Sequence, residues 1–226
     1  MGIFSTSTDA DPLPPSAAVY GRLMLSIYDL YVLGISNRFA WRCPTPRILN
    51  LYNQSISARH LDIGVGTGFY LDRVRFPSDQ PTVHLMDINP LALARAAHRI
   101  RRYRPRCIQE DVTDAEKILE ESYDSIAVNY LFHCLSGALP DKGGQLLEQV
   151  LPFLSPSGGR LFGATILGQG VKHNALGQRL MTVYNQKGIF GNRSDSVEQL
   201  HTLFETRFDH YKLKIHGCVA LFVGYR

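Results

Sequence analysis

The amino-acid sequence predicts an α/β fold built on a mostly parallel β-sheet that ends in an antiparallel hairpin. From about residue 57 onward, short apolar runs alternate with helical stretches, as in HLDIGV, TVHLMDI and LALARAAHRIRRY. This alternation is typical of parallel sheets that carry helices on both faces. The end of the chain differs, because only Gly217 separates HYKLKIH from CVALFVGY. Strands joined by so short a turn must pair antiparallel.

The composition is that of one folded domain. The chain has 226 residues, of which 45% are hydrophobic and 19% charged, so it can bury a sizeable core and is not intrinsically disordered. A net charge of +4 is too small to indicate nucleic-acid binding without a basic patch. No stretch approaches the roughly 20 apolar residues that a membrane-spanning helix needs.

The cysteines are scattered through the chain without a C-x-x-C pair, and three of them lie in apolar runs. This arrangement argues against a zinc site or a disulfide framework and favours reduced core thiols. We therefore expect no metal centre and a cytoplasmic localisation. The four residues are Cys43, Cys107, Cys134 and Cys218.

The N-terminal part of the chain precedes the predicted sheet. Residues 1–15 are rich in Ser, Thr, Asp and Pro, and we expect a disordered tail there. The opening MGIFST matches the pattern for myristoylation at Gly2, but so short a pattern often occurs by chance, and we do not expect acylation. Residues 16–56 should form a helical cap, with apolar residues at helical spacing over 17–39 and a further helix over 45–55.

The predicted sheet domain covers 57–226, and two of its helices carry clear start signals. Asn89 precedes a proline, which places an N-cap residue before the first helical position. Ser196 and Gln199 have the spacing of a capping box, so a helix should begin there and run to about residue 206.

The strongest functional signal is HLDIGVGTG at residues 60–68, where a predicted strand ends and glycines follow at alternate positions. Glycine lets a backbone turn sharply and lets a ligand approach the main chain closely. The spacing G-x-G-x-G departs from the G-x-G-x-x-G of dinucleotide sites. Asp62 would repel a phosphate but attract an ammonium group. The motif therefore favours a nucleoside that carries an amino acid over a dinucleotide.

Two further aspartates fall at the ends of the next predicted strands. Asp87 should end the second strand, where a carboxylate can accept hydrogen bonds from both ribose hydroxyls. Asp111 should end the third, where it can accept from an adenine amino group while the Val112 N–H meets a ring nitrogen. Strand-end aspartates also cap helices, but three at consecutive strand ends indicate the ligand-binding edge of an open α/β sheet.

With these motifs the sequence resembles the class I S-adenosylmethionine-dependent methyltransferases. The resemblance implies a Rossmann-like sheet of seven strands, S-adenosyl-L-methionine as cofactor and S-adenosyl-L-homocysteine as product. By resemblance, Asp62, Gly64 and Gly66 line the methionine part of the cofactor, and Tyr28 covers it; the alternative for Tyr28 is a packed core aromatic. The expected cofactor-binding residues are Tyr28, Asp62, Gly64, Gly66, Thr67, Gly68, Asp87, Ile88, Asp111, Val112 and Asn129.

The segment after the predicted fourth strand bears on the substrate. It reads Asn129-Tyr130-Leu131-Phe132-His133, without the Asn/Asp-Pro-Pro-aromatic motif of family members that methylate nucleic-acid bases. It resembles the loop of small-molecule methyltransferases instead. We expect His133 and Tyr130 to be the catalytic residues, with His133 as a base because imidazole titrates near neutral pH. The alternative, a structural His133 bonded to backbone or cofactor, stays open.

An insert over about 168–195 is longer than an ordinary connection and should form a substrate lid. With an upstream tryptophan, its aromatic residues would enclose a mostly apolar pocket that excludes water. Alternatively, these aromatics pack the lid onto the core. The expected substrate-binding residues are Trp41, His173, Tyr184 and Phe190.

We therefore expect an enzyme that methylates an O, N or C atom of a small, largely apolar metabolite, as in secondary metabolism. One alternative is a cyclisation or rearrangement without methyl transfer, and another is a non-enzymatic subunit. RNA or protein methylation is supported only by the arginine-rich run 95–106, which we expect to be a solvated helix face. The expected partner is a small molecule and not a nucleic acid, and the oligomeric state stays open.

Overall fold

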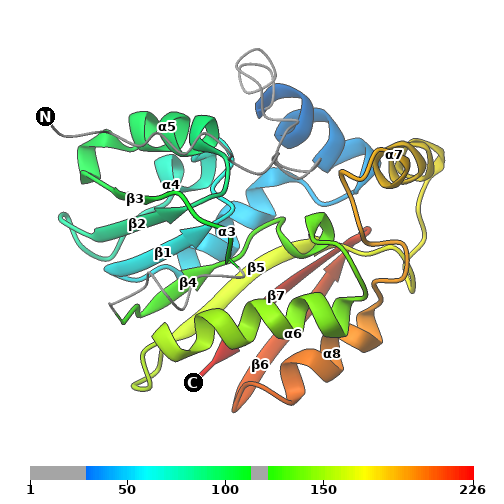
Figure 1. The fold of residues 1–226 in the computed structure, drawn as a ribbon. Helices are drawn as coiled ribbons and strands as arrows, with labels where there is room; N and C mark the ends of the chain where they lie inside the picture. The colour runs from blue at the N-terminus through cyan, green and yellow to red at the C-terminus, as the bar shows by residue number, and fades with distance from the viewer. Residues whose placement is uncertain (1–28, 113–121) are drawn as a thin grey trace, which may run out of the picture.

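The computed structural model of the chain describes residues 29–112 and 122–226 and contains one mixed sheet of seven strands in the order β3-β2-β1-β4-β5-β7-β6 (Figure 1). The five strands from β1 to β5 are parallel, whereas β7 is antiparallel to both β5 and β6. The predicted parallel sheet with a C-terminal antiparallel hairpin is thus confirmed. The strands are β1 (Arg59–Ile63), β2 (Thr82–Met86), β3 (Arg106–Ile108), β4 (Ser125–Ala127), β5 (Arg160–Ile166), β6 (His210–His216) and β7 (Val219–Tyr225).

Two predicted strand ends are wrong, that at Asp111 by three residues and that at Asp87 by one. The third strand was expected to reach Asp111, but β3 ends at Ile108. The reason is the register, since Ile108 pairs with Met86, the last residue of its neighbour β2. Beyond that point the chain has no strand to pair with, and Asp111 lies in the loop that follows. Asp87 comes directly after β2.

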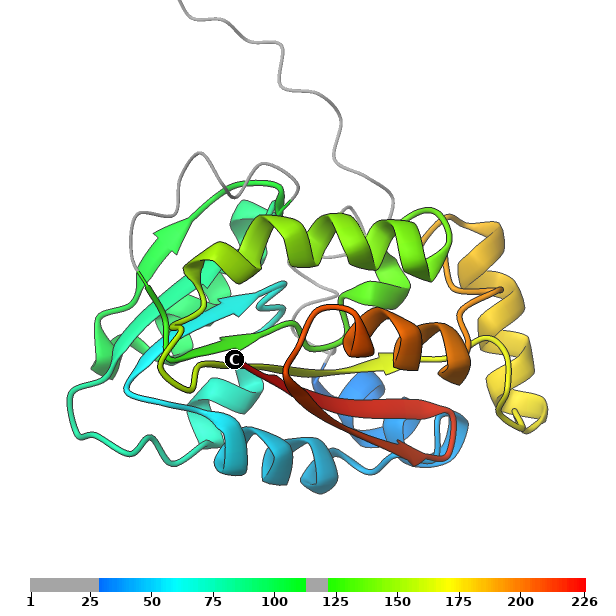
Figure 2. The ribbon, with the colours of Figure 1, turned by 90° about the horizontal axis from the view of Figure 1, so that it is seen from below.

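Helices cover both faces of the sheet (Figure 2). One face carries α3 (Thr45–Ser55), α4 (Phe69–Arg73) and α5 (Pro90–Arg99), and the other carries α6 (Leu139–Val150) and α8 (Val197–Glu205). Both predicted caps are present. The Asn89 side chain accepts hydrogen bonds from the first turn of α5, and Ser196 and Gln199 form the capping box of α8.

Two further helices lie beyond the carboxyl end of β5 and contact each other (Figure 1). They are η1 (Asp29–Ala40), a wide π-type helix, and α7 (Ala175–Gln186) within the predicted lid. Short 3₁₀ turns follow several elements: η2 (Arg101–Tyr103), η4 (Phe132–Cys134) and η5 (Leu151–Phe153). The tail 1–15, Gly2 and Tyr28 lie outside the described residues.

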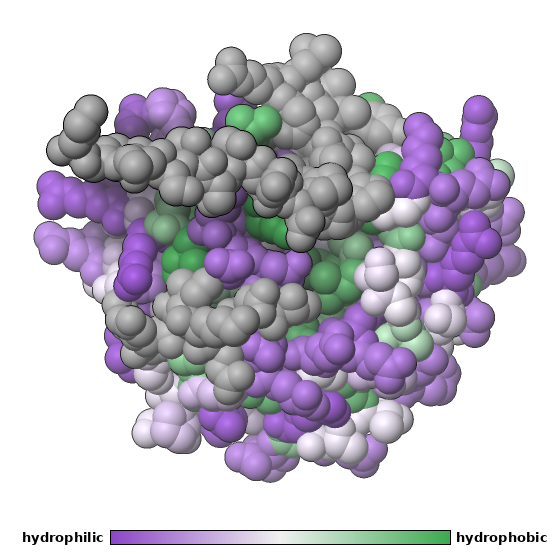
Figure 3. Space-filling view, in the orientation of Figure 1, coloured by the Kyte–Doolittle hydropathy of each residue, from purple (hydrophilic) through white to green (hydrophobic). Residues whose placement is uncertain are grey.

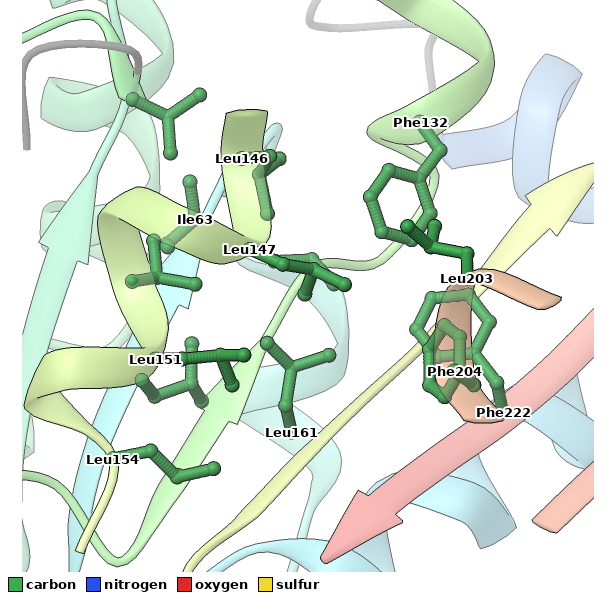
Figure 4. Close-up of a cluster of buried hydrophobic side chains, with 14 of the residues drawn as sticks. Ile63, Phe132, Leu146, Leu147, Leu151, Leu154, Leu161, Leu203, Phe204 and Phe222 are labelled. Atoms are coloured by element: carbon green, nitrogen blue, oxygen red, sulfur yellow. The ribbon is translucent and has the colours of Figure 1, made fainter. Parts of the chain in front are cut away.

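The apolar core lies in two layers, one on each side of the sheet. Figure 4 shows the layer under α6 and α8, where Leu147 of α6 approaches Leu161 of β5, and Phe204 of α8 lies against Phe222 of β7. The other layer includes Trp41, Tyr52 and Phe162. On the face drawn in Figure 3, hydrophobic residues show near the middle and hydrophilic residues surround them.

The cysteines are all free thiols. Cys43 and Cys218 are buried, as expected, but Cys107 is exposed because it lies on β3 at the edge of the sheet. Within the described part of the chain, no helix is long and apolar enough to cross a membrane. No cluster of three His, Cys, Asp or Glu side chains suited to a metal ion occurs among these residues.

Candidate functional site

The glycine motif forms a tight turn directly after β1. Gly64, Gly66 and Gly68 all have left-handed backbone angles, with φ of 72°, 53° and 70°, which residues with a Cβ rarely adopt. At Gly68 space is also limited, because a Cβ there would lie 2.9 Å from the Ala96 Cα of α5. At Gly66, apart from its chain neighbours, no atom of residues 29–112 and 122–226 lies within 4 Å of such a Cβ, so these residues leave open space there.

Two hollows flank this turn at the carboxyl ends of the parallel strands, and three residues line both: Gly64, Gly66 and Tyr130. The first hollow contains Asp62, and the second contains Asp87 and Asp111. The three predicted acids are therefore brought to one edge of the sheet. The first hollow is completed by Tyr52, Val65, Thr67, Gly68, Phe69, Tyr70, Leu71 and Asn129. The second is completed by Ile63, Met86, Ile88, Glu110, Val112, Leu131, Cys134 and Leu135.

The Asp87 carboxylate is half-buried beside the glycine turn. Burial raises its pKa to about 6, while the nearby backbone amides of Asn89, Gly66 and Val65 act in the opposite direction and the Asp62 charge adds to the rise. Its Oδ1 accepts a 2.9 Å hydrogen bond from the Asn89 N–H. Additional hydroxyl donors would stabilise the ionised carboxylate, as expected for an acid that binds a ribose.

Asp62 is held from behind by a residue that the sequence analysis missed. The Tyr52 hydroxyl of α3 donates a 3.0 Å hydrogen bond to Asp62 Oδ2, and both side chains are buried. Tyr52 also stacks on Tyr70, with 5.1 Å between ring centroids. Nothing in the helical pattern of α3 separates Tyr52 from an ordinary core aromatic, so its role becomes visible only in the fold.

Tyr130 has an unusual backbone for a non-glycine residue, with φ of 58°. Its hydroxyl donates a 2.9 Å hydrogen bond to Asn37 Oδ1 in η1. With its hydroxyl proton committed in this way, Tyr130 is better suited to form a wall between the two hollows than to transfer a proton. Asn129, directly before it, lines the first hollow and is 9% exposed.

His133 is buried, and burial together with the nearby Lys142 charge lowers its pKa to about 3. Its Nδ1 accepts hydrogen bonds from the Ile166 N–H at 3.3 Å and from the Thr165 hydroxyl at 3.4 Å. Because a backbone N–H can only donate, the neutral ring carries its proton on Nε2. Of the two roles considered for His133, this geometry favours the structural or hydrogen-bond-donating role over that of a base.

The four expected substrate residues do come together. Phe190 lies 4.9 Å from Tyr184 and 6.0 Å from Trp41, and Trp41 lies 6.3 Å from His173, as measured between ring centroids. Phe190 also contacts the His133 ring edge-on at 4.5 Å. We call Trp41, His133, His173, Tyr184 and Phe190 the aromatic wall. Trp41 is almost fully buried, so it serves in part to pack the lid onto the core.

A buried ion pair, also missed from the sequence, anchors the lid. Lys142 Nζ of α6 lies 2.8 Å from Asp195 Oδ2, and the two side chains are 3% and 0% exposed. The same ammonium donates to the backbone oxygens of Gly191 and Leu135 at 2.8 and 3.3 Å. Lys142 thus connects the segment after β4, which carries His133, to the end of the lid.

The arginine-rich run is only partly the solvated face that was expected. Arg99 donates to Thr67 Oγ1 at 3.0 Å, and Arg102 donates to Asp72 Oδ1 at 2.6 Å. The C-terminal part of α5 packs against α4, and from there Arg99 supports the glycine turn and Arg102 supports α4. Arg99 is half-buried, whereas the rest of the run is exposed: Arg95, Arg101, Arg102, Arg104 and Arg106.

The residues present fit an adenosyl ligand that carries an amino acid. Asp62 is a buried carboxylate facing one hollow, and Asp87 is a half-buried carboxylate of raised pKa facing the other. The left-handed turn at Gly64 and Gly66 separates them with bare backbone. A carboxylate in each hollow matches a ligand with an ammonium group at one end and hydroxyl donors in the middle.

Comparisons with known proteins agree with this geometry. Residues 61–161 match the family model of a methyltransferase domain. The chain is 35% identical to demethylluteothin O-methyltransferase of Streptomyces thioluteus, over 90% of this chain and 88% of that protein. It is 36% identical to the physcion biosynthesis cluster O-methyltransferase of Aspergillus chevalieri, over 93% and 95% of the two chains. Its fold is similar to that in the DhpI–SAH complex structure, with a TM-score of 0.67, 14% identity and coverage of 93% and 95%.

Proposed function

The chain belongs to the class I S-adenosylmethionine-dependent methyltransferases, and we propose that it methylates a hydroxyl oxygen of a small, largely apolar metabolite. The observation that carries the proposal is the pair of hollows that share the Gly64–Gly66 turn, with the buried Asp62 in one and the half-buried Asp87 in the other. Oxygen is favoured over nitrogen or carbon as the acceptor because the relatives named above are O-methyltransferases.

In this proposal each hollow receives one part of the cofactor. Asp62 accepts from the ammonium group in the first hollow, beside Thr67, Gly68 and Asn129. Asp87 accepts from the ribose hydroxyls in the second hollow, beside Ile88. Asp111 and the Val112 N–H bind the adenine edge there. When bound, S-adenosyl-L-methionine supplies a methyl group already activated on a sulfonium, so the protein contributes chiefly by positioning, which can reach effective molarities of about 10⁵ M or more.

The acceptor side is formed by the aromatic wall together with Tyr130. Phe190 and Tyr184 contribute apolar surface from the lid, and Phe190 contacts His133. Such a surface binds an apolar substrate and excludes water. His133, with its proton on Nε2, can donate a hydrogen bond to the acceptor oxygen but is a poor proton acceptor. We therefore expect the substrate hydroxyl to be acidic, as in a phenol or enol, and to lose its proton to solvent before the substrate is enclosed.

The proposal is tested with purified protein, S-adenosyl-L-methionine and a panel of phenolic and enolic compounds, with matched amines as controls. Mass spectrometry should find one S-adenosyl-L-homocysteine for each O-methylated product. Substrate consumption without S-adenosyl-L-homocysteine would instead support the cyclisation or rearrangement alternative. Folded protein that does not bind S-adenosyl-L-homocysteine in a calorimetric titration would overturn the proposed function.

A further inference from the structure

Behind the glycine turn, the Asp62 carboxylate belongs to a buried chain of polar groups that spans three elements. Its Oδ2 accepts the 3.0 Å hydrogen bond from Tyr52 of α3 and lies 3.6 Å from His60 Nε2 on β1. Across the imidazole ring, His60 Nδ1 lies 2.8 Å from Oγ of Ser125 on β4. All four side chains are more than nine-tenths buried.

The directions of these hydrogen bonds follow from the groups at the two ends of the buried series, the Ser57 N–H and the Asp62 carboxylate. The backbone N–H of Ser57 donates to Ser125 Oγ at 2.9 Å, and the Ser125 hydroxyl can then donate its own proton to His60 Nδ1. That leaves Nε2 as the ring nitrogen that carries its proton towards the carboxylate. The opposite tautomer would set the lone pair of Nε2 against a carboxylate oxygen, which is unfavourable.

Ring packing holds the two side chains that face Asp62 in place. Tyr52 stacks on Tyr70 with an interplanar angle of 12° and meets Phe162 edge-on at 5.0 Å. His60 stacks on the same Phe162 ring at 5.9 Å. Because packing already fixes these rings, little further conformational entropy is lost when they hold the carboxylate.

Both contacts fall on the same carboxylate oxygen. Oδ2 has Tyr52 and His60 beside it, whereas Oδ1 accepts no hydrogen bond from the residues that the structure describes. Asp62 lines the first hollow. The carboxylate is therefore fixed by one oxygen, and the described residues leave the other available to a ligand.

We propose that Tyr52, supported by His60 and Ser125, is a positioning residue that orients Asp62 to receive the ammonium group of the cofactor's amino-acid end. This inference rests on the proposed function and adds a source of ligand selectivity to it. It makes the protein distinguish an adenosyl amino acid from a truncated nucleoside such as 5′-methylthioadenosine, which has no ammonium group.

The test compares two ligands in two variants by isothermal titration calorimetry, without turnover. Tyr52→Phe removes the hydroxyl but keeps the stacked ring. We expect it to weaken S-adenosyl-L-homocysteine binding about 5- to 20-fold and to leave 5′-methylthioadenosine binding within twofold of wild type. Tyr123→Phe is the matched control, because its buried hydroxyl bonds His84 Nδ1 at 2.8 Å and it lines neither hollow. It should change neither affinity.

The variant Asp62→Asn completes the design. It should weaken S-adenosyl-L-homocysteine binding at least tenfold, and adding Tyr52→Phe to it should have no further effect beyond twofold. Unchanged S-adenosyl-L-homocysteine affinity in Tyr52→Phe, or an equal loss for both ligands, would overturn the positioning role while leaving the proposed function intact. Wild-type protein that binds neither ligand would overturn the proposed function itself.

Discussion

The Tyr130 hydroxyl donates a 2.9 Å hydrogen bond to Asn37 Oδ1 and thereby joins the segment after β4 to helix η1. Asn37 is fully buried and also connects η1 to α3, because its side-chain nitrogen donates a hydrogen bond to Thr45 Oγ1 at the start of α3. At the other end, the Tyr130 N–H donates to the Ala164 oxygen of β5 at 2.7 Å. A residue that lines both hollows is thus held in its left-handed conformation from two sides.

Removing this hydroxyl should affect both stability and turnover. In Tyr130→Phe the buried Asn37 oxygen loses its donor, so we expect the free energy of unfolding to fall by about 1–2 kcal/mol. The loss of kcat/KM for the acceptor should exceed the loss of S-adenosyl-L-homocysteine affinity. Urea unfolding and calorimetry measure these effects. Tyr211→Phe, which breaks an exposed hydrogen bond to His201, is the control and should change stability by less than about 0.5 kcal/mol.

The role of His133 can be read from a pH profile. With a pKa of about 3, its imidazole is neutral throughout the range in which the enzyme would be assayed. We therefore expect His133→Ala to lower turnover, to leave cofactor affinity nearly unchanged, and to keep the shape of the pH–kcat profile of the wild type. If the variant lost a limb of the profile between pH 6 and 7, His133 would be a titrating base after all.

Cofactor affinity should depend on pH through Asp87. Its pKa is raised to about 6, and ribose hydroxyls donate to the ionised form, so binding favours the deprotonated carboxylate. Affinity for S-adenosyl-L-homocysteine should therefore be full above pH 7 and weaken about tenfold by pH 5. Asp87→Ala should bind at least tenfold more weakly at pH 7 and lose this dependence. Asp111→Asn should weaken binding but keep the dependence of affinity on pH. A wild-type affinity that is constant from pH 5 to pH 8 would contradict the assignment of Asp87 as the ribose-binding residue.

The Lys142–Asp195 pair gives a stability prediction with a definite pH sign. In Lys142→Met the Asp195 carboxylate stays buried without its partner, so we expect a loss of about 3–5 kcal/mol in unfolding free energy at pH 8. Burial raises the pKa of Asp195, and the loss should shrink towards pH 5 as the unpaired carboxyl takes up a proton. Denaturant unfolding at both pH values measures it. Lys187→Met, at an exposed position, is the control and should hardly change the free energy of unfolding. An equal loss for Lys142→Met at both pH values would contradict the explanation.

The sequence predicts the part of this protein that depends on local patterns. Strand–helix alternation and the short turn at Gly217 predict the sheet, and the glycine spacing with its three acids predicts the cofactor edge. What it does not predict are contacts between distant residues. Tyr52 becomes significant only when α3 packs against β1, and Lys142 only when α6 meets the end of the lid.

The hydrogen bonds of His133 explain why its chemistry could not be assigned from its residue type. A histidine beside a reactive site suggests a base, but its pKa and tautomer depend on which groups face each ring nitrogen. Here the Ile166 N–H faces Nδ1 and burial removes water. Neither feature is encoded near position 133. Likewise, the end of β3 depends on where its neighbour β2 stops.

The placement of β7 between β5 and β6 has a consequence for how the protein folds. Within the described residues β6 pairs with β7 alone, so it can join the rest of the sheet only after β7 has docked on β5. That docking closes a long loop, because Ile166 pairs with Val219 across the whole lid and α8. Closing such a loop is entropically costly and slow. The hairpin should therefore dock on β5 late, and the amide hydrogens of β7 that bond to β5 should gain protection after those of β1 during refolding.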